Sequence, residues 1–261
     1  IVFGDWSSDV CSSDLQVFGA CKAAIDHVSF IIGNELNAAV DNPLIFAQDN
    51  KVVSGGNFHG EPVALVMDYL KLALAEMGDI IERQINKLVD SSTNDGLPSF
   101  LIHSTGLNSG LMIVQYAAAA IVSENKVLVH PASADSIPTC ENTEDHVSMG
   151  TIAARQAYQI LENVERITAY AIFSGFYAIN LRLETFNKVG MDSNPFEVMA
   201  RPTYEFYNAV KDSNANFLNP DFLNSDRFLS PEIERLLKAF PTFQGIANKY
   251  LKFKDYKIVY E

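Results

Sequence analysis

The stretch PVALVMDYLKLALAEMGDIIERQINKLV, residues 62–89, sets the expected fold class. Its proline suits the first turn of a helix, where the missing N–H has no intrahelical partner to lose. Apolar residues then recur with helical spacing on more than one stripe. They are Leu65, Leu70, Leu72, Leu74, Met77, Ile80, Ile81, Ile85 and Leu88. At roughly 28 residues this helix would be about 40 Å long, and such helices usually pack in multi-helix or oligomeric cores.

Three further long helices are expected on either side of this stretch. They cover about residues 16–40, 108–129 and 142–183. The first ends at Asp41-Asn42-Pro43, because proline cannot continue the helical hydrogen bonding. Asn108 is the expected N-cap of the helix after it, and Asn142 or Thr143 that of the last, since short polar side chains accept hydrogen bonds from first-turn N–H groups.

The rest of the chain divides into a hairpin and an aromatic-rich end. Apolar residues at 44–46 and 52–53 flank a polar turn and predict a small β-hairpin. After residue 184 the sequence becomes rich in Phe and Tyr, and five prolines cut it into short helices. We therefore expect an all-α fold, a long-helix bundle with one small β-hairpin. Its helical-bundle portion would be residues 16–184, and residues 185–261 a C-terminal short-helix region.

Composition excludes several classes of partner. The 261 residues are 48% hydrophobic and carry 19 basic against 32 acidic side chains, a formal charge of −13. An acidic chain without a Lys/Arg cluster argues against nucleic acid and against an anionic membrane as partner. No uninterrupted apolar run reaches the roughly 18 residues of a membrane span. Three cysteines are too few for a disulfide framework, so a reducing compartment, the cytoplasm, is expected.

The first 15 residues, IVFGDWSSDVCSSDL, look foreign to the rest. They repeat Ser-Ser-Asp and show no helix or strand periodicity, and residues 5–15 resemble the translation of a sequencing-library adapter. We interpret residues 1–15 as a non-native leader. The alternative is a natural Ser/Asp-rich arm.

A glycine-rich turn, Gly55-Gly-Asn-Phe-His-Gly60, precedes the helix quoted above. Such a turn at a helix N-terminus can bind an anion. However, Glu61 follows where a phosphate-binding loop has Lys-Ser/Thr, and its carboxylate would repel phosphate. A plain tight turn, whose glycines serve only backbone geometry, remains open. The turn is notable for holding Asn57, Phe58 and His59 beside a helix end.

A second candidate is Glu144-Asp145-His146, expected in the first turn of the last long helix. Acidic residues there have a plain structural explanation, since each stabilises the helix dipole by about 0.3–1 kcal/mol. No Glu-x-x-His or His-Glu-x-x-His pattern occurs, so no metal site is expected. No Ser or Cys pairs with His and Asp at a recognisable spacing.

Several motifs, in order along the chain, resemble those of the aromatic amino acid ammonia-lyases, and the histidine enzymes most closely. They are SGGNFHGEPV at 54–63, GLNSGLMI at 106–113 with SENK at 123–126, and DSIP at 135–138 with EDHVSM at 144–149. DNPL at 41–44 and QVFGA at 16–20 also fit. The resemblance covers about residues 16–170 and fades beyond.

The resemblance implies a fold, a reaction and an assembly. The fold is the ammonia-lyase (fumarase/aspartase-like) helical bundle, in a homotetramer whose active sites each draw on three subunits. The reaction removes ammonia from a small-molecule amino-acid substrate with no external cofactor. Its electrophile is methylidene-imidazolone, made from an internal Ala-Ser-Gly, and a tyrosine removes the β-proton.

Two family site positions carry over residue by residue. Phe58 matches the phenylalanine beside the electrophile and the substrate. Glu144 matches the glutamate that in the histidine enzymes contacts the imidazole, where the phenylalanine and tyrosine enzymes usually carry an amide. A carboxylate can accept a ring N–H or stabilise an imidazolium, which favours histidine as substrate. Asn57 and His59 are further substrate-binding candidates.

The chain also departs from the family pattern. It contains no Ala-Ser-Gly, and the Tyr-Ser-x-Arg segment expected just before residue 16 is missing. Thr143 stands where a glutamine is usual, and Cys140 is atypical. We therefore expect the C-terminal part of a histidine ammonia-lyase-like enzyme, inactive alone. The alternatives are a tyrosine or phenylalanine ammonia-lyase or aminomutase, and a non-catalytic helical assembly protein.

Overall fold

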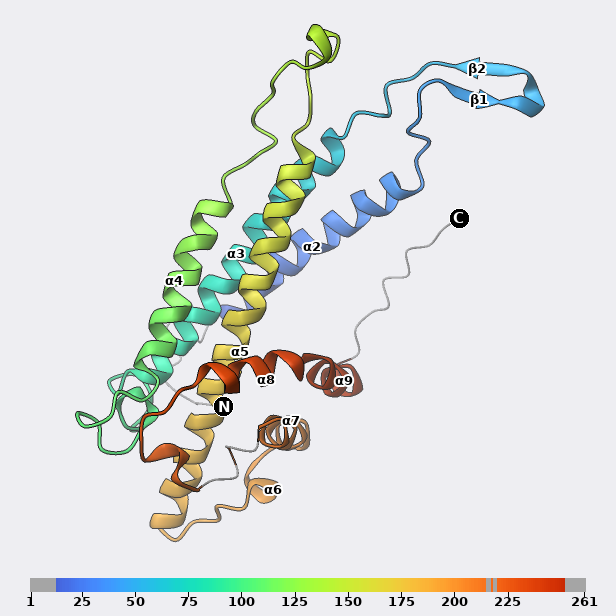
Figure 1. Cartoon of the computed structure of the whole chain (residues 1–261). Coiled ribbons are helices and arrows are strands. Elements are labelled where there is room, and N and C mark those ends of the chain that lie inside the picture. Colours follow the sequence, from blue (N-terminus) through green and yellow to red (C-terminus); the bar gives the residue numbers. More distant parts are fainter. Residues whose placement is uncertain (1–12, 215–216, 218–219, 252–261) are drawn as a thin grey trace. The chain divides into compact units, whose positions relative to one another are not determined.

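A computed structural model describes residues 13–214, 217 and 220–251, so the expected leader lies almost wholly outside the described residues. Four long helices dominate the described chain (Figure 1). They are α2 (Asp14–Leu36), α3 (Glu61–Val89), α4 (Met112–Leu128) and α5 (Gly150–Lys188). Shorter helices follow: α6 (Pro195–Val198), α7 (Arg201–Asp212), α8 (Ser230–Lys238) and α9 (Phe240–Tyr250). The all-α expectation is confirmed, including the short helices after the long bundle.

The expected hairpin is present between α2 and α3. Strands β1 (Leu44–Phe46) and β2 (Lys51–Val53) pair antiparallel, with Leu44 opposite Val53. Asn50 closes the turn in a left-handed conformation, with φ of 49°, which asparagine tolerates better than most residues. Most side chains of both strands are exposed, so the hairpin rests on few contacts within this chain.

Three of the four long helices begin or end elsewhere than expected. Helix α2 stops at Leu36 rather than near residue 40, where the Asn37 side chain donates to Gly33 O at 2.8 Å. Helix α4 begins at Met112, because Asn108 donates its amide to His103 O at 3.2 Å instead of capping a first turn. Helix α5 begins at Gly150, well after the expected caps at residues 142 and 143.

The chain forms two compact units, to which α3, α4 and α5 each contribute a part. The aromatic unit contains the described residues within 1–14, 78–122 and 165–255, and the hairpin unit those within 15–77 and 123–164. The expected boundaries at residues 15 and 184 rest on sequence texture and stay predictions.

The aromatic unit has a large buried core centred on α5. Phe173 and Phe176 are buried there, and Phe217 stacks on Phe176 with ring centroids 4.4 Å apart. Tyr207 of α7 stacks on the same ring at 5.1 Å. The aromatic-rich end of the sequence thus packs against the end of the longest helix, where offset rings add to the stabilisation from burial.

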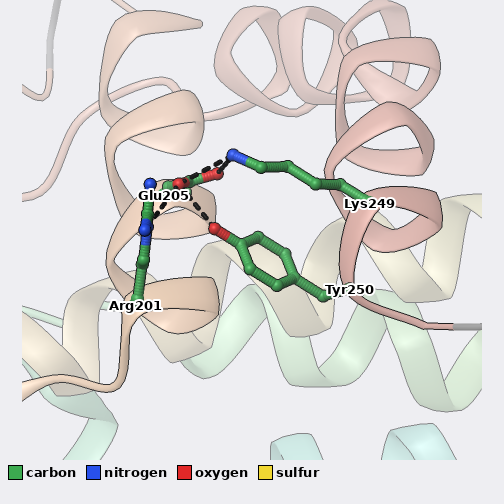
Figure 2. Close-up of polar contacts among 4 residues, drawn as sticks. All are labelled: Arg201, Glu205, Lys249 and Tyr250. Carbon is green, nitrogen blue, oxygen red and sulfur yellow. Dashed lines mark hydrogen bonds and ion pairs between the residues drawn. The ribbon is translucent and has the colours of Figure 1, made fainter.

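Figure 2 shows the polar contacts that tie α9 to α7 in the same unit. The Glu205 carboxylate accepts hydrogen bonds from Lys249 Nζ at 2.7 Å and from the Tyr250 hydroxyl at 2.5 Å. Arg201 Nε donates to it at 3.3 Å. The hydrogen bonds from Lys249 and Tyr250 lower the pKa of Glu205 to about 2.

A buried ion pair organises the hairpin unit. Lys71 is fully buried on α3, and its Nζ lies 2.6 Å from Asp68 Oδ1. The same nitrogen donates to His130 O at 2.8 Å and to Gln156 Oε1 at 2.6 Å. Asp68 Oδ2 accepts the Ser133 N–H at 2.8 Å. The buried charge is therefore compensated, and the network fixes the chain after α4 that leads to residues 139–149.

The apolar clusters of the hairpin unit are small. One contains buried Cys21, Ala24 and Ala73, where α2 meets α3. By length and composition, α2 is the one helix among the described residues that could span a membrane. An uninterrupted apolar run of that length was not predicted from the sequence. Only 17% of the apolar window in α2 is buried within the chain, and α2 carries the Lys22–Asp26 ion pair at 2.7 Å.

Candidate functional site

The candidate residues lie on two segments of the hairpin unit. Asn57, Phe58 and His59 belong to the turn before α3, and Glu144 to the segment before α5. Phe58 is 58% exposed, and the Asn57 and Glu144 side chains are also exposed. The structure therefore presents Phe58 and Glu144 to solvent and leaves them free to contact a ligand.

The glycine-rich turn is built by backbone hydrogen bonds and one imidazole. His59 N–H donates to Gly56 O at 3.2 Å, which closes the turn. The Glu61 N–H donates to His59 Nδ1 at 3.2 Å, so the imidazole satisfies one of the free N–H groups at the start of α3. His59 thus has a structural role that the sequence did not reveal.

Gly60 is the glycine of this turn that lies closest to the segment before α5. A Cβ at this position would lie 3.0 Å from Ser148 Oγ, closer than an ordinary contact, whereas one at Gly55 would meet nothing within 4 Å. The turn therefore packs closely against the segment before α5. Neither a positive φ nor a close contact requires glycine at Gly55, whereas Gly60 lies close to the Ser148 side chain.

Glu144 does not lie in a helix, contrary to expectation. Thr139 and Glu144 pair as an isolated antiparallel bridge, in which the Thr139 N–H donates to Glu144 O at 2.9 Å. The Thr139 hydroxyl also donates to Glu144 Oε2 at 2.7 Å. These bonds give the backbone an alternative to the helix, as short polar side chains often do. The helix-dipole explanation of Glu144 is therefore wrong.

The turn that carries Glu144 is conformationally strained. Cys140, Glu141 and Asn142 have φ of 51°, 53° and 66°, three successive non-glycine residues in the left-handed region. Each such residue costs of order 1 kcal/mol or more. Such strain is concentrated at functional sites in proteins, and here it precedes the carboxylate singled out from the sequence.

Two histidines join the two segments. His59 Nε2 lies 3.3 Å from His146 Nδ1 and 3.1 Å from His146 O, and the two rings have centroids 5.3 Å apart. Thr139 and His146 are the residues that sequence reasoning missed as partners. No spacing signal could have found the histidine pair, because 87 positions separate its members.

Two further requirements concern a metal ion and the expected electrophile. Among residues 13–214, 217 and 220–251, no group of three or more His, Cys, Asp or Glu side chains converges as metal ligands would. The expected electrophile, methylidene-imidazolone, would be made from Ala-Ser-Gly, and these 261 residues do not contain that tripeptide. The residues present therefore do not form that group.

The chain is similar to known members of one family. The family model described as "Aromatic amino acid lyase" matches residues 12–212. The chain is 49% identical over 221 residues to the histidine ammonia-lyase of Symbiobacterium thermophilum, covering 85% of this chain and 40% of that protein. It is 56% identical over 167 residues to the histidine ammonia-lyase of Caldanaerobacter subterraneus subsp. tengcongensis, covering 64% and 33%. The chain thus spans about two fifths or less of these curated relatives.

Solved structures share the fold. The histidine ammonia-lyase of Trypanosoma cruzi aligns with a TM-score of 0.80 at 38% identity, over 93% of this chain and 44% of that one. The tyrosine aminomutase of Streptomyces globisporus aligns with a TM-score of 0.81 at 31% identity, over 95% and 44%. Coverage this high includes much of the aromatic-rich end, which the motifs alone could not match.

Proposed function

The chain belongs to the aromatic amino acid lyase family, and on that premise we propose that it forms part of an ammonia-lyase acting on L-histidine. The products would be urocanate and ammonia. One observation carries the choice of substrate: Glu144 presents a carboxylate, held by Thr139, from the segment that packs against the Phe58 turn. Relatives that are 49% and 56% identical carry the name histidine ammonia-lyase, which supports the proposal.

The chemistry of Glu144 suits an imidazole. The Thr139 hydroxyl donates to Oε2, which leaves the lone pairs of Oε1 available to a ring N–H of the substrate. A hydrogen bond to an ionised carboxylate is stronger than one to a neutral amide. The exposed Phe58 ring offers an apolar face to a planar aromatic substrate. Together these side chains would bind and orient the ring.

The remaining parts of the reaction would come from outside these residues. We propose that methylidene-imidazolone is supplied elsewhere in the whole protein, so this chain alone is inactive. We also propose a cytoplasmic homotetramer. An exposed stripe on α3 supports an assembly: Leu65, Tyr69 and Leu72 are 55%, 45% and 55% exposed and share one helix face.

The test uses the complete protein that carries this chain, assayed with histidine, tyrosine and phenylalanine. Urocanate formation from histidine is expected to dominate. Glu144→Gln should lower kcat/KM for histidine about a hundredfold or more if the carboxylate takes part in proton transfer. Glu141→Gln is the matched control, an exposed glutamate on the same turn, and should leave the rate unchanged. Equal rates for Glu144→Gln and wild type would refute the imidazole role.

A second candidate is an aminomutase or lyase acting on tyrosine or phenylalanine. The similarity to the tyrosine aminomutase, with a TM-score of 0.81, is the observation in its favour. Turnover of tyrosine or phenylalanine in preference to histidine would establish it. No turnover of any of the three substrates would favour the non-catalytic helical assembly protein.

A further inference from the structure

The histidine pair joins the two segments that carry Phe58 and Glu144. His59 is the neighbour of Phe58, and His146 lies two positions after Glu144. The rings meet through His59 Nε2 and His146 Nδ1, 3.3 Å apart. Beside this contact, Gly60 lies close to the Ser148 side chain.

The hydrogen bonds fix the direction of this contact. His59 Nδ1 accepts the Glu61 N–H at 3.2 Å, so this nitrogen is unprotonated and the neutral ring has its proton on Nε2. That N–H then donates across to the other segment, where His146 O lies at 3.1 Å and His146 Nδ1 at 3.3 Å. His59 is therefore a bridge: it accepts from its own helix and donates to the neighbouring segment.

The same bonds argue against a metal ion between the rings. A metal would need the lone pair of His59 Nε2, and metal-bound histidines usually donate through their other ring nitrogen. Here the other nitrogen, Nδ1, accepts a backbone N–H instead. The pair thus fits a hydrogen-bonded connection between two segments.

We propose that His59 and His146 are positioning residues that set the place of the Glu144 carboxylate relative to the substrate. The route is short. The Thr139–Glu144 bridge holds the segment before α5 together, and so does the hydrogen bond from the Val147 N–H to Ser136 Oγ at 3.0 Å. His59 contacts this segment at His146, two positions after the Glu144 carboxylate. The inference rests on the proposed function, in which Glu144 binds the imidazole of the substrate.

Two substitutions at one position separate the two hydrogen bonds of His59. His59→Asn keeps an acceptor near the Nδ1 position for the Glu61 N–H but cannot reach the other segment. His59→Gln places an amide N–H near the Nε2 position and can donate to His146 O, but it loses the acceptor near Nδ1. If positioning matters, kcat for histidine in the complete protein should fall ten- to hundredfold further in His59→Asn than in His59→Gln. The reverse order would show that His59 only caps α3 and would overturn the proposal.

A double variant tests whether His59 acts through Glu144. In the Glu144→Gln background, His59→Asn should lower kcat little more, because the group it positions is already lost. Full multiplication of the two effects would overturn the proposal.

Amide hydrogen exchange separates this inference from the proposed function, because it needs no activity. On this chain, exchange over residues 139–147 should be faster in His59→Asn than in His59→Gln, and equal exchange would overturn the positioning role even if histidine is the substrate. Faster exchange with no effect of Glu144→Gln on histidine turnover would leave the positioning role standing and refute the proposed function. Zn²⁺ slowing exchange in wild type but not in His59→Asn would show a metal site in place of the hydrogen bond.

Discussion

The two units of this chain bury their apolar side chains to different extents. In the aromatic unit, side chains from α5, α7 and the residues between α7 and α9 form one large core, with Phe176 at 3% exposure. Among the described residues of the hairpin unit, two apolar clusters contain three buried residues each, while Phe30 of α2 is 64% exposed. Small clusters supply much less hydrophobic stabilisation than a closed core.

This difference indicates which contacts stabilise each unit. The aromatic unit has a large apolar core, beside which a buried ion pair joins Arg227 to Glu232 at 2.7 Å. The hairpin unit is held by specific polar contacts, the buried Lys71 network and the contact between His59 and His146, and its exposed helix faces suit association. The candidate site lies in the unit with the smaller core, in keeping with the tendency of binding segments to come from the less stable parts of a protein.

Phe176→Ala tests whether the aromatic unit depends on its core. Removing a ring that stacks on Phe217 and Tyr207 should lower the free energy of unfolding by about 3–5 kcal/mol. Urea unfolding followed by circular dichroism measures this. Phe228→Ala is the control, because that ring is 79% exposed and its loss should change stability by less than about 0.5 kcal/mol. Equal effects of the two variants would contradict a closed aromatic core.

Asp68→Asn tests whether the hairpin unit depends on its polar network. The change leaves the fully buried Lys71 charge without its carboxylate and should cost about 3 kcal/mol. Asp26→Asn removes the partner of an exposed lysine and should cost less than about 0.5 kcal/mol. Burial acts to raise the pKa of Asp68, but hydrogen bonds from Lys71 and Ser133 outweigh it and the pKa lies below its ordinary value.

That lowered pKa fixes the direction of a pH effect. A carboxyl group with a lowered pKa stabilises the fold fully above its unfolded value, near 3.9, and loses this contribution as the pH falls. Wild type should therefore lose stability below about pH 4 more steeply than Asp68→Asn. Parallel pH profiles of the two proteins would show that the network does not stabilise the unit.

The sequence predicted the elements of this fold better than their ends. Periodicity located the long helices and the hairpin, because burial on one helix face imposes a repeat on the sequence. It misplaced the starts of α4 and α5, where the Asn108 side chain donates to His103 O and Asn224 O, and the Thr139 hydroxyl donates to the Glu144 carboxylate. The Asn224 contact is a tertiary property that local propensity does not encode, and the two local hydrogen bonds compete with the helix for the same side chains.

The candidate site was also predictable from the sequence only in part. Resemblance selected Phe58 and Glu144, whose chemistry follows from the residue type. The histidine contact could not be predicted, since it depends on how the loop before α5 folds back on the turn before α3. The left-handed run at residues 140–142 was equally hidden, because Cys and Glu give no signal for that conformation.

Gly60→Ala probes the close contact within the hairpin unit. The added Cβ would meet Ser148 Oγ at 3.0 Å, so stability should fall by about 1 kcal/mol. Ser148→Ala in the same chain should restore most of it, because the Ser148 Cβ lies at 3.8 Å from the new atom. Gly55→Ala, with open space around it, is the control for lost glycine flexibility. Failure of the second substitution to rescue would place the strain elsewhere.

Glu205→Gln gives the smallest expected effect and returns to the aromatic unit. Glu205 accepts from Lys249 and Tyr250 on α9, and its pKa is lowered to about 2. An unfolded glutamate titrates near 4.3, so the contribution is complete above that pH and is lost as the pH falls toward 2. The difference in unfolding midpoint between wild type and Glu205→Gln should therefore be present at pH 6 and shrink by pH 3.

Salt and a matched glutamate complete this test. The Glu205 side chain is 27% exposed, so 1 M salt should screen its attraction to Lys249 and reduce the difference at pH 6. Glu234→Gln removes a carboxylate paired with Arg166 at 3.0 Å, where both side chains are about half exposed, and should change the midpoint less. A pH-independent difference for Glu205→Gln would mean that its carboxylate charge does not hold α9 to α7. The attachment of α9 to α7 would then depend on apolar packing, such as that of Phe206 against Phe243, whose ring centroids are 5.0 Å apart.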